Sequence, residues 1–468
     1  MQRLGFVYNL QTPTWQDAFR AGLRPRSYLL APNNATPANR RLAAAARSDR
    51  RLLLADNGNF VLISRVAADF KQEAEALRLE VVALEKRLKR SARPTDIDGP
   101  LRERYRDLAT RVRARAEAIA PDPTQMRQRQ RELNPTHAIG VESLVMASWM
   151  SLDIEPEFLG WTRALYRGLN ERVARTAAGL DVPDDAYTVA SAVSYDTAFD
   201  AGRTFAKAGI QRVAMGFGAY MVDQQYTDYL QMGRRTISLG GRIPRRNVRT
   251  AGVARGFAEG YASVAGRAPT GFHCLGLGTP KMMAAAALAL WGVRELTFDA
   301  TSPMRDAAEG TLYVTKPTHQ KVRTRKVALR LATDPTAEWG CPCPFCSAFT
   351  ARHPFDHAGA RQWGALTMPS EVSADDLRPG GGLYAALPLL SEPRGGAIRS
   401  AVTFARMGHN HWAIERLLAS LRPAINDREK LRTRVDRIVS DYASGSIATY
   451  GDAARVMYLI AAAEAPFA

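Results

Sequence analysis

The stretch Glu295-Leu296-Thr297-Phe298-Asp299 is a short apolar run that ends on a carboxylate. Ala300-Thr301-Ser302-Pro303 follows it, and the chain then reaches Cys341-Pro342-Cys343-Pro344-Phe345-Cys346. In parallel α/β sheets, reactive side chains stand where a buried strand ends. We therefore expect Asp299 to be a catalytic carboxylate, with a metal held by the cysteines beside it.

Seven other short apolar runs resemble this one, and from Asp196 onward they alternate with helical patterns such as Ala198–Ala208, Asn247–Ala265 and Lys281–Trp291. Apolar strands between helices predict a parallel sheet that is buried on both faces. Eight such strands favour an α/β fold with a closed (β/α)8 TIM-like barrel over an open doubly wound sheet. The predicted strands are Ser27–Pro32, Leu52–Asp56, Leu144–Ser148, Thr188–Val193, Val213–Gly216, Thr236–Gly240, Phe272–Gly276 and Glu295–Asp299.

A helical hairpin is predicted between the second and third runs. Apolar residues with 4-3-4 spacing form two stripes, which are joined by the breaker-rich segment Ser91–Pro100. The stripes are Leu77, Val81, Leu84 and Leu88, and then Leu101, Tyr105, Leu108 and Val112. We accordingly divide the chain into a barrel start (1–64), a basic hairpin insertion (65–135), the remainder of the barrel (136–335) and a zinc-binding, C-terminal helical region (336–468).

The charge balance favours a polyanionic partner, because the chain has 64 Lys and Arg against 46 Asp and Glu, a net charge of +18. The hairpin is dense in basic residues, among them Lys86, Arg87, Arg104, Arg111 and Arg115. It could grip a phosphate backbone, or it could be a solvated packing arm or the contact of a homodimer. Residues 1–10 lack the apolar core of a signal peptide, and no run reaches membrane-spanning length, so we expect a cytoplasmic protein without a membrane partner.

Three of the four cysteines lie within six residues, which predicts a metal site in a reducing compartment and not a disulfide framework. The spacing C-x-C-x-x-C suits three thiolate ligands of a tetrahedral zinc ion. The fourth ligand could be His353, His357, His409 or His411. With four protein ligands, the zinc would be structural, since no position is left for an activated water.

Together these residues resemble the signature of the tRNA-guanine transglycosylase superfamily. The resemblance covers about Leu52 to Arg422 and lies in the Phe298–Pro303 run, the cysteine motif and the pair His409-Asn410. Three glycine-containing segments fit in the same order along the chain. They are Leu54-Ala55-Asp56-Asn57-Gly58-Asn59-Phe60, Ser238-Leu239-Gly240-Gly241 and Leu275-Gly276-Leu277-Gly278-Thr279-Pro280.

The resemblance implies a role for each matching residue. Asp299 would be the nucleophile and Asp56 the general acid/base, while Asp153 would read the edge of the guanine. Gly240 and Gly241 would offer backbone amides to the base, and Asn57 and Gly58 would belong to the substrate-binding loop. The zinc ligands would be Cys341, Cys343, Cys346 and His409. From the residues alone, Asp56 could instead be a turn residue and Asp153 a helix cap.

The implied reaction is the exchange of guanine in a nucleic acid for a 7-deazaguanine base through a covalent Asp299 glycosyl-enzyme. The run Thr301-Ser302-Pro303-Met304-Arg305 and the long separation of Cys346 from His409 look more like the DNA-modifying branch than the tRNA enzymes. We therefore expect DNA as the substrate, with tRNA as the alternative and an ATPase partner left open. A third possibility is a non-catalytic paralogue that binds nucleic acid.

Overall fold

The computed structural model describes residues 3–10, 25–154, 163–180, 186–217, 226–233, 235–314, 320–333, 341–347, 396–444 and 448–463. These residues form two compact units. The first unit contains residues 1–11, 26–300 and 421–468, and the second contains residues 12–25 and 301–420. The boundaries of the units therefore differ from the predicted ranges 136–335 and 336–468.

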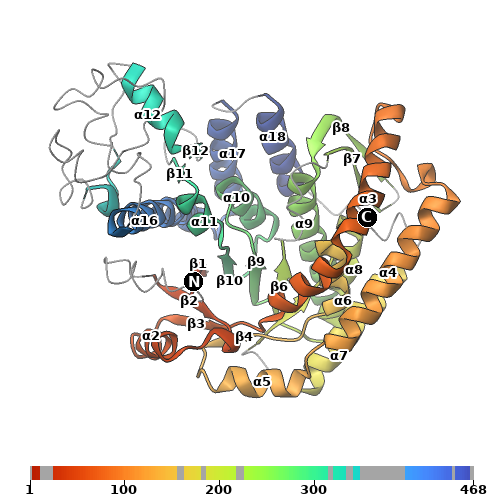
Figure 1. Ribbon diagram of the computed structural model, residues 1–468, viewed down its shortest axis with the longest axis horizontal. Helices are drawn as coiled ribbons and strands as arrows, with labels where there is room; N and C mark the ends of the chain where they lie inside the picture. The colour runs from red at the N-terminus through yellow and green to blue at the C-terminus, as the bar shows by residue number, and fades with distance from the viewer. Residues whose placement is uncertain are drawn as a thin grey trace. The chain divides into compact units, whose positions relative to one another are not determined.

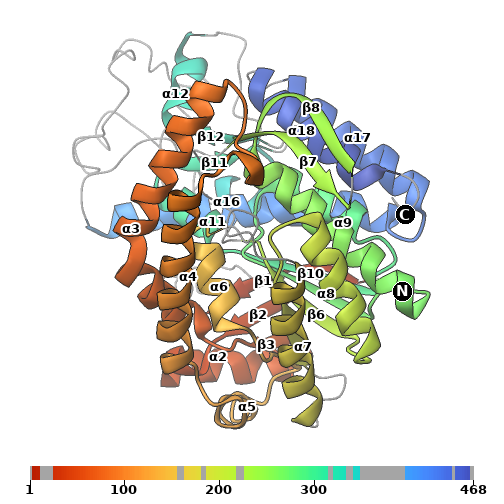
Figure 2. The ribbon, with the colours of Figure 1, turned by 90° about the vertical axis from the view of Figure 1, so that its right-hand side faces the viewer.

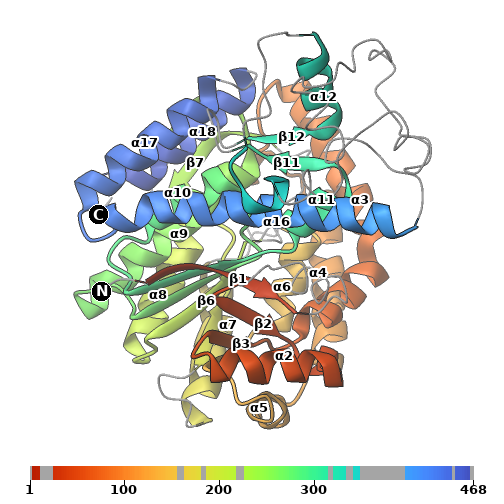
Figure 3. The ribbon, with the colours of Figure 1, turned by 90° about the vertical axis from the view of Figure 1, so that its left-hand side faces the viewer.

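The first unit is built on a closed barrel of eight parallel strands, in the order β1-β10-β9-β6-β5-β4-β3-β2 (Figure 1). The predicted barrel is thus confirmed. Pairing of β1 with both β10 and β2 closes it, and Figure 3 shows β1 next to β2. The strands are β1 (Arg3–Asn9), β2 (Ser27–Leu30), β3 (Leu52–Ala55), β4 (His137–Ile139), β5 (Ala186–Ala190), β6 (Arg212–Gly216), β9 (Gly271–Leu275) and β10 (Glu295–Asp299).

Six of the predicted runs are barrel strands, and two are not. Leu144–Ser148 lies in helix α6 (Leu144–Ser151), which begins where the Ser143 hydroxyl accepts a hydrogen bond from the Met146 amide. This helix is buried on nearly every side, so its short apolar run carries no period that would separate helix from strand. Thr236–Gly240 is extended, but it lies in β8 (Arg235–Pro244), which pairs antiparallel with β7 (Tyr226–Met232) outside the barrel.

Their places in the barrel are taken by β1 and β4, which the patterns missed. β4 is only three residues long, too short to show a period.

The barrel interior holds a hydrophobic cluster from six strands. Its members are Val7, Leu29, Leu52, Leu54, Ile139, Tyr187, Val189 and Ala214. At the amino ends of the strands, Arg212 on β6 forms an ion pair with Glu295 on β10, with 3.0 Å between Nη1 and Oε2. The same guanidinium also donates to the Tyr187 hydroxyl at 3.3 Å. Opposite charges therefore neutralise each other at this end of the barrel.

Helices surround the barrel. They are α2 (Pro37–Ser48), α3 (Asn59–Leu88), α4 (Gly99–Ile119), α5 (Pro123–Arg131), α6, α7 (Arg163–Gly179), α8 (Tyr195–Lys207), α9 (Arg245–Ala265), α10 (Pro280–Ala289), α17 (Arg428–Ser444) and α18 (Ala448–Ala462). α8 and α9 approach closely at glycines. A Cβ added at Gly202 would lie 2.3 Å from the Phe257 carbonyl oxygen, and one at Gly260 would lie 2.0 Å from that of Phe199. Larger residues at these two positions would force the helices apart.

The predicted hairpin is confirmed as α3 and α4, which run side by side in Figure 2. Its first helix begins at Asn59, six residues before the predicted boundary at 65. The buried Glu85 near the tip contacts Arg242 of β8 at 2.8 Å and Arg245 of α9 at 3.6 Å. The Ser91 amide donates to Asp228 of β7 at 3.3 Å. The tip is therefore fastened to the β7–β8 hairpin.

The second unit contains α11 (Ser302–Ala308), α12 (Thr324–Thr333), α16 (Gly396–Leu421) and a two-stranded antiparallel sheet. The strands of this sheet are β11 (Thr311–Tyr313) and β12 (Lys321–Arg323). Asn410 of α16 fastens these parts together. Its side chain accepts from the Tyr313 amide at 2.9 Å and donates to the carbonyl oxygens of Pro303 and Thr311, each at 3.0 Å.

Candidate active site and metal centre

Asp299 is the last residue of β10, and its buried side chain is held from the neighbouring strand β9. Asp299 Oδ1 accepts a hydrogen bond from the Gly276 amide at 3.0 Å. Gly276 has a φ of +74°, a conformation that glycine adopts without strain. These contacts fix the carboxylate at the carboxyl end of the barrel strands, where the sequence predicts it.

His273 of β9 lies beside Asp299 and was not predicted. Its Nε2 is 3.4 Å from Asp299 Oδ1, and its Nδ1 is 2.9 Å from the Thr297 hydroxyl. The ring is fully buried. The buried imidazole of His273 therefore packs directly against the carboxylate of the predicted nucleophile. A histidine within an apolar strand run gives little signal in the sequence.

Asp56 directly follows β3 and is half-buried. Burial, together with the negative charge of Asp299, raises the pKa of Asp56 to about 6. A hydrogen bond of 2.9 Å from the Asn57 amide to Asp56 Oδ1 opposes part of this rise. The structure therefore brings Asp56 and Asp299 together, with Asp56 able to take up and release a proton near neutral pH.

Asn57 and Gly58 shape the turn that carries Asp56. The Asn57 side chain donates to the Gly140 carbonyl at 3.3 Å, and its Oδ1 accepts from the Asn59 amide at 3.0 Å. Gly58 has a φ of +72° and precedes the first residue of α3. Both residues have a structural reason to be in the loop, and their contact with a substrate stays a prediction.

Glu142, which lies just after β4, is a third carboxyl group at this end of the barrel and was missed in the sequence. Its Oε2 accepts from Asn57 Nδ2 at 3.3 Å and from Asn59 Nδ2 at 3.1 Å. Burial and the charge of Asp56 raise the pKa of Glu142 to about 7, against the effect of both hydrogen bonds. The available signal in the sequence was its place two residues before the apolar run Leu144–Ser148. That run predicts a strand of its own, whereas the barrel strand is β4, which ends before Glu142. We call Asp56, Glu142, Asp299 and His273 the mouth cluster.

Asp153 contacts Arg249 of α9, with 3.2 Å between Oδ1 and Nη1. It follows α6 and has a φ of +57°, a left-handed conformation that aspartate adopts more readily than most residues. Its predicted contact with guanine stays a prediction.

Gly240 and Gly241 lie in β8 and not at the end of a barrel strand. Both are exposed, and nothing lies within 4 Å of a Cβ added at either position. Their backbone is therefore accessible, but the prediction that placed them on a barrel strand was wrong.

Cys341, Cys343, Cys346 and His409 form the predicted metal centre in the second unit. Their ligand atoms all lie within 4.8 Å of one another, and all of these residues except the half-buried Cys341 are buried. The distances from His409 Nδ1 to the three sulfurs are 3.4, 3.5 and 3.4 Å. A donor set of three thiols and one imidazole in this arrangement fits a metal ion.

The surroundings of His409 support this arrangement. His409 Nε2 lies 3.1 Å from the Tyr313 carbonyl oxygen, so Nε2 carries the proton and the lone pair of Nδ1 faces the sulfurs. The preceding residue, Gly408, leaves room for the Phe345 ring of the cysteine loop, since an added Cβ would lie 2.3 Å from the ring.

Of the other histidines considered, His411 lies outside the cluster. It is buried in α16, and its Nδ1 donates to the Met407 carbonyl at 2.8 Å. His353 and His357 lie outside the described residues.

Many basic residues of the hairpin are paired with acids within it. Arg104 contacts Glu80, Arg115 contacts Asp69 at 2.9 Å, and Arg111 contacts both Glu73 and Asp107. Lys86 and Arg87 have no acidic partner among the described residues. These ion pairs occupy basic side chains along the middle of the hairpin, and the contact of the hairpin with a phosphate backbone stays a prediction.

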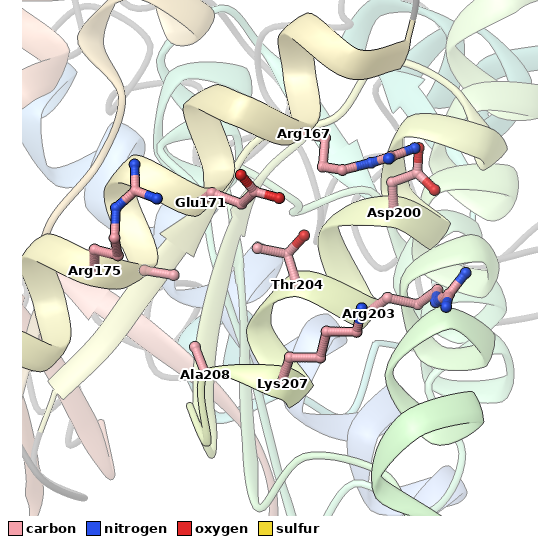
Figure 4. A pocket seen from close by; sticks show the side chains of 9 residues that line it. Arg167, Glu171, Arg175, Asp200, Arg203, Thr204, Lys207 and Ala208 are labelled. Atoms are coloured by element: carbon pink, nitrogen blue, oxygen red, sulfur yellow. The ribbon is translucent and has the colours of Figure 1, made fainter.

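A cleft of about 310 Å³ lies between α7 and α8, on the outside of the barrel. Figure 4 shows Glu171 and Arg175 of α7 facing Thr204 and Lys207 of α8 across it. Arg167 and Asp200 pair at 3.3 Å in the same cleft. It is lined by charges of both signs and is separate from the strand ends that carry the mouth cluster.

Among the described residues, no helix combines the length and the apolar character needed to cross a membrane. No protein-family model matches the chain, and no curated protein sequence matches it.

Proposed function

We propose that the protein is a base-exchange transglycosylase that replaces guanine in a nucleic acid with a 7-deazaguanine base. The observation that carries this proposal is the pair of carboxyl groups at the barrel mouth. The Asp299 carboxylate accepts a hydrogen bond from the Gly276 amide and lies 3.4 Å from His273 Nε2, while Asp56 has a pKa raised to about 6. Two carboxyl groups in different environments suit one nucleophile and one proton carrier. The resemblance of the surrounding motifs to guanine transglycosylases supports the choice of reaction.

In the first half of the proposed reaction, an oxygen of Asp299 attacks the anomeric carbon of the target nucleotide. The bond from this carbon to guanine N9 breaks, its electron pair stays on the base, and Asp56 gives the base a proton. The product is a glycosyl ester of Asp299. The negative charge of Asp299 also stabilises the cationic character that the sugar carbon develops.

In the second half, the 7-deazaguanine gives its N9 proton to the Asp56 carboxylate and attacks the same carbon. The ester bond breaks, and its electrons return to Asp299. The proton that left with guanine has been replaced, so both carboxyl groups end in their starting states. The target nucleotide must leave its stack to reach the end of a barrel.

For the metal centre, we propose a structural zinc ion. Tetrahedral zinc has bonds of about 2.3 Å to sulfur and about 2.0–2.1 Å to nitrogen, so a thiolate and an imidazole nitrogen should lie roughly 3.5 Å apart. The three S···N distances, 3.4, 3.5 and 3.4 Å, agree with this value. The zinc would hold the cysteine loop against α16, and with four protein ligands it would leave the chemistry to the carboxyl groups.

The proposed reaction is tested by trapping the covalent intermediate. The protein is incubated with guanine-containing duplex DNA, single-stranded DNA or unmodified tRNA, together with a 7-deazaguanine, and denatured. We expect a denaturation-resistant complex with DNA that is absent in Asp299→Ala and present in Asp107→Ala, which changes an exposed aspartate of α4. A complex with tRNA alone would retain the mechanism and reverse the substrate. If no nucleic acid is trapped but salt-sensitive binding persists, the protein is a binding paralogue.

A further inference from the structure

Glu142 lies between the turn that carries Asp56 and a cavity of about 260 Å³. The cavity is lined by Asn59, by the segment Val141–Val145 that contains Glu142, and by side chains from α4, α5 and α7. On the loop side, Glu142 Oε2 accepts hydrogen bonds from the side-chain amides of Asn57 and Asn59, the first and third residues after Asp56. One carboxyl group therefore holds both ends of the turn that carries Asp56.

The charges around Glu142 leave it without a counter-ion. No basic side chain lies within ion-pair distance of it among the described residues. Asp56 faces it from the β3 loop, and Glu117 of α4 and Arg172 of α7 line the same cavity. Glu117 is engaged by Arg113 at 3.0 Å and by Arg172 at 3.8 Å. The carboxyl group that interacts most directly with Glu142 is thus Asp56, which has the same sign when ionised.

The hydrogen bonds accommodate both protonation states of Glu142. As a carboxylate, it accepts from both asparagine amides. Asn59 Oδ1 is a buried acceptor that has no donor within the described part of the chain. A half-turn of the Asn59 amide exchanges its oxygen and nitrogen, so a protonated Glu142 could donate to this oxygen. Neither state of Glu142 requires the turn to break.

We propose that Glu142 is a positioning residue that takes up and releases a proton next to Asp56 and thereby regulates the charge of this proton carrier. This inference rests on the proposed function. Two neighbouring carboxyl groups titrate as a pair, in which the ionisation of one strengthens the proton affinity of the other. The charge of Asp56 contributes to the raised pKa of Glu142, about 7, and the Asn57 side chain that donates to Glu142 belongs to the residue whose amide donates to Asp56. Above neutral pH, an ionised Glu142 would help Asp56 to keep the proton needed by the leaving guanine.

The coupling is tested first in the substrate-free protein, by infrared titration of the carboxyl groups in wild type, Glu142→Gln and Asp56→Asn. We expect two titration steps near neutral pH in the wild type and the loss of the upper step in Glu142→Gln. In Asp56→Asn, the pKa of Glu142 should fall, because the charge of Asp56 contributes to its rise. A Glu142 titration that does not change in Asp56→Asn would overturn the proposal. This readout does not depend on base exchange, so it separates failure of the coupling from failure of the proposed function.

The second test is the pH profile of base exchange. Glu142→Gln keeps an acceptor for the asparagine amides, so it should match the wild type below about pH 6.5 and become up to about tenfold slower above pH 7.5. Glu142→Ala removes the acceptor and should be slower at every pH. Glu117→Gln, the control in the same cavity, should follow the wild-type profile. Superimposable profiles of wild type and Glu142→Gln would reduce Glu142 to a purely structural role.

Discussion

The two ends of the barrel differ in how their charged side chains are paired. At the amino ends of the strands, Arg212 and Glu295 form a 3.0 Å ion pair, and each side chain is 14% exposed. At the carboxyl ends, three carboxyl groups, those of Asp56, Glu142 and Asp299, lie together beside the imidazole of His273. The ion pair at the amino ends neutralises the charges of its two side chains. Among the described residues, the carboxyl groups at the opposite end have no such partner, and their mutual repulsion lowers the folding stability when they are ionised. Such a difference agrees with the proposal that the carboxyl ends of the strands carry the reaction and that the amino ends stabilise the barrel.

Asp299→Asn should have the largest effect on activity and little on folding. Asparagine can still accept from the Gly276 amide, but it cannot form the glycosyl ester. We expect base exchange to fall by at least about 10⁴-fold, as for loss of a nucleophile in other enzymes. The unfolding midpoint in urea should stay the same or rise, because one of the like charges is removed. A clear decrease in the unfolding midpoint would mean that the Asp299 carboxylate also stabilises the folded barrel.

Glu295→Ala should do the reverse. It leaves the half-buried Arg212 guanidinium without its counter-ion, so we expect a loss of folding free energy of up to about 3–5 kcal/mol, the typical cost of breaking a buried ion pair. The rate of base exchange at a temperature where the variant is folded should remain near that of the wild type. The control is the double variant Arg212→Met/Glu295→Leu, which removes both charges and should recover most of the lost stability. Equal destabilisation in the single and double variants would argue against an unpaired charge as the cause.

Titration of Asp56 measures the like-charge effect at the mouth directly. The pKa of about 6 is above the ordinary value of 3.8. The folded protein therefore takes up this proton as the pH falls through 6, whereas the unfolded chain does so near 3.8. The contribution of Asp56 to the free energy of unfolding therefore increases as the pH falls from 6 to 3.8. Above pH 6, where Asp56 is ionised in both states, its burial lowers the stability of the fold.

In Asp299→Asn, the pKa of Asp56 should decrease but stay above 3.8, because burial remains its largest cause. An Asp56 titration that is identical in the variant and the wild type would show that the two carboxyl groups do not interact.

The smallest effect is expected at the exposed ion pairs of the hairpin. Arg115 and Asp69 meet at 2.9 Å, but their side chains are 40% and 42% exposed. Arg115→Ala should change the folding free energy by less than about 1 kcal/mol, in contrast to the barrel pair. If Arg115→Ala instead weakens DNA binding and the salt dependence of binding, the hairpin contacts phosphates along its middle as well.

The barrel class, the hairpin and the cluster of three cysteines and His409 were predictable because the sequence carries a local pattern for each, although two of the eight strands were assigned wrongly. Cysteine spacing and a following His-Asn pair are readable in one dimension, as are the apolar stripes of α3 and α4. β4 was missed because three residues carry no period, and Leu144–Ser148 was misassigned because a helix buried on all sides lacks one too.

Glu142 and His273 were missed for a different reason. Their significance lies in what surrounds them, since Glu142 interacts with Asp56 and His273 with Asp299 between paired strands, β3 with β4 and β9 with β10. Thr236–Gly240 is extended as expected, but only pairing shows that it belongs to a hairpin and not to the barrel.

The continuity of α3 limits how the protein can be re-engineered. Its 30 residues make a rod about 45 Å long, which begins at Asn59 beside Glu142 and carries Glu85 near its other end. Excision of 65–135 would cut this rod before its second turn is complete and remove the buried anchor for Arg242 and Arg245. A minimal barrel would therefore have to retain the first turns of α3, rejoin the chain before β4 and replace both arginines with neutral residues.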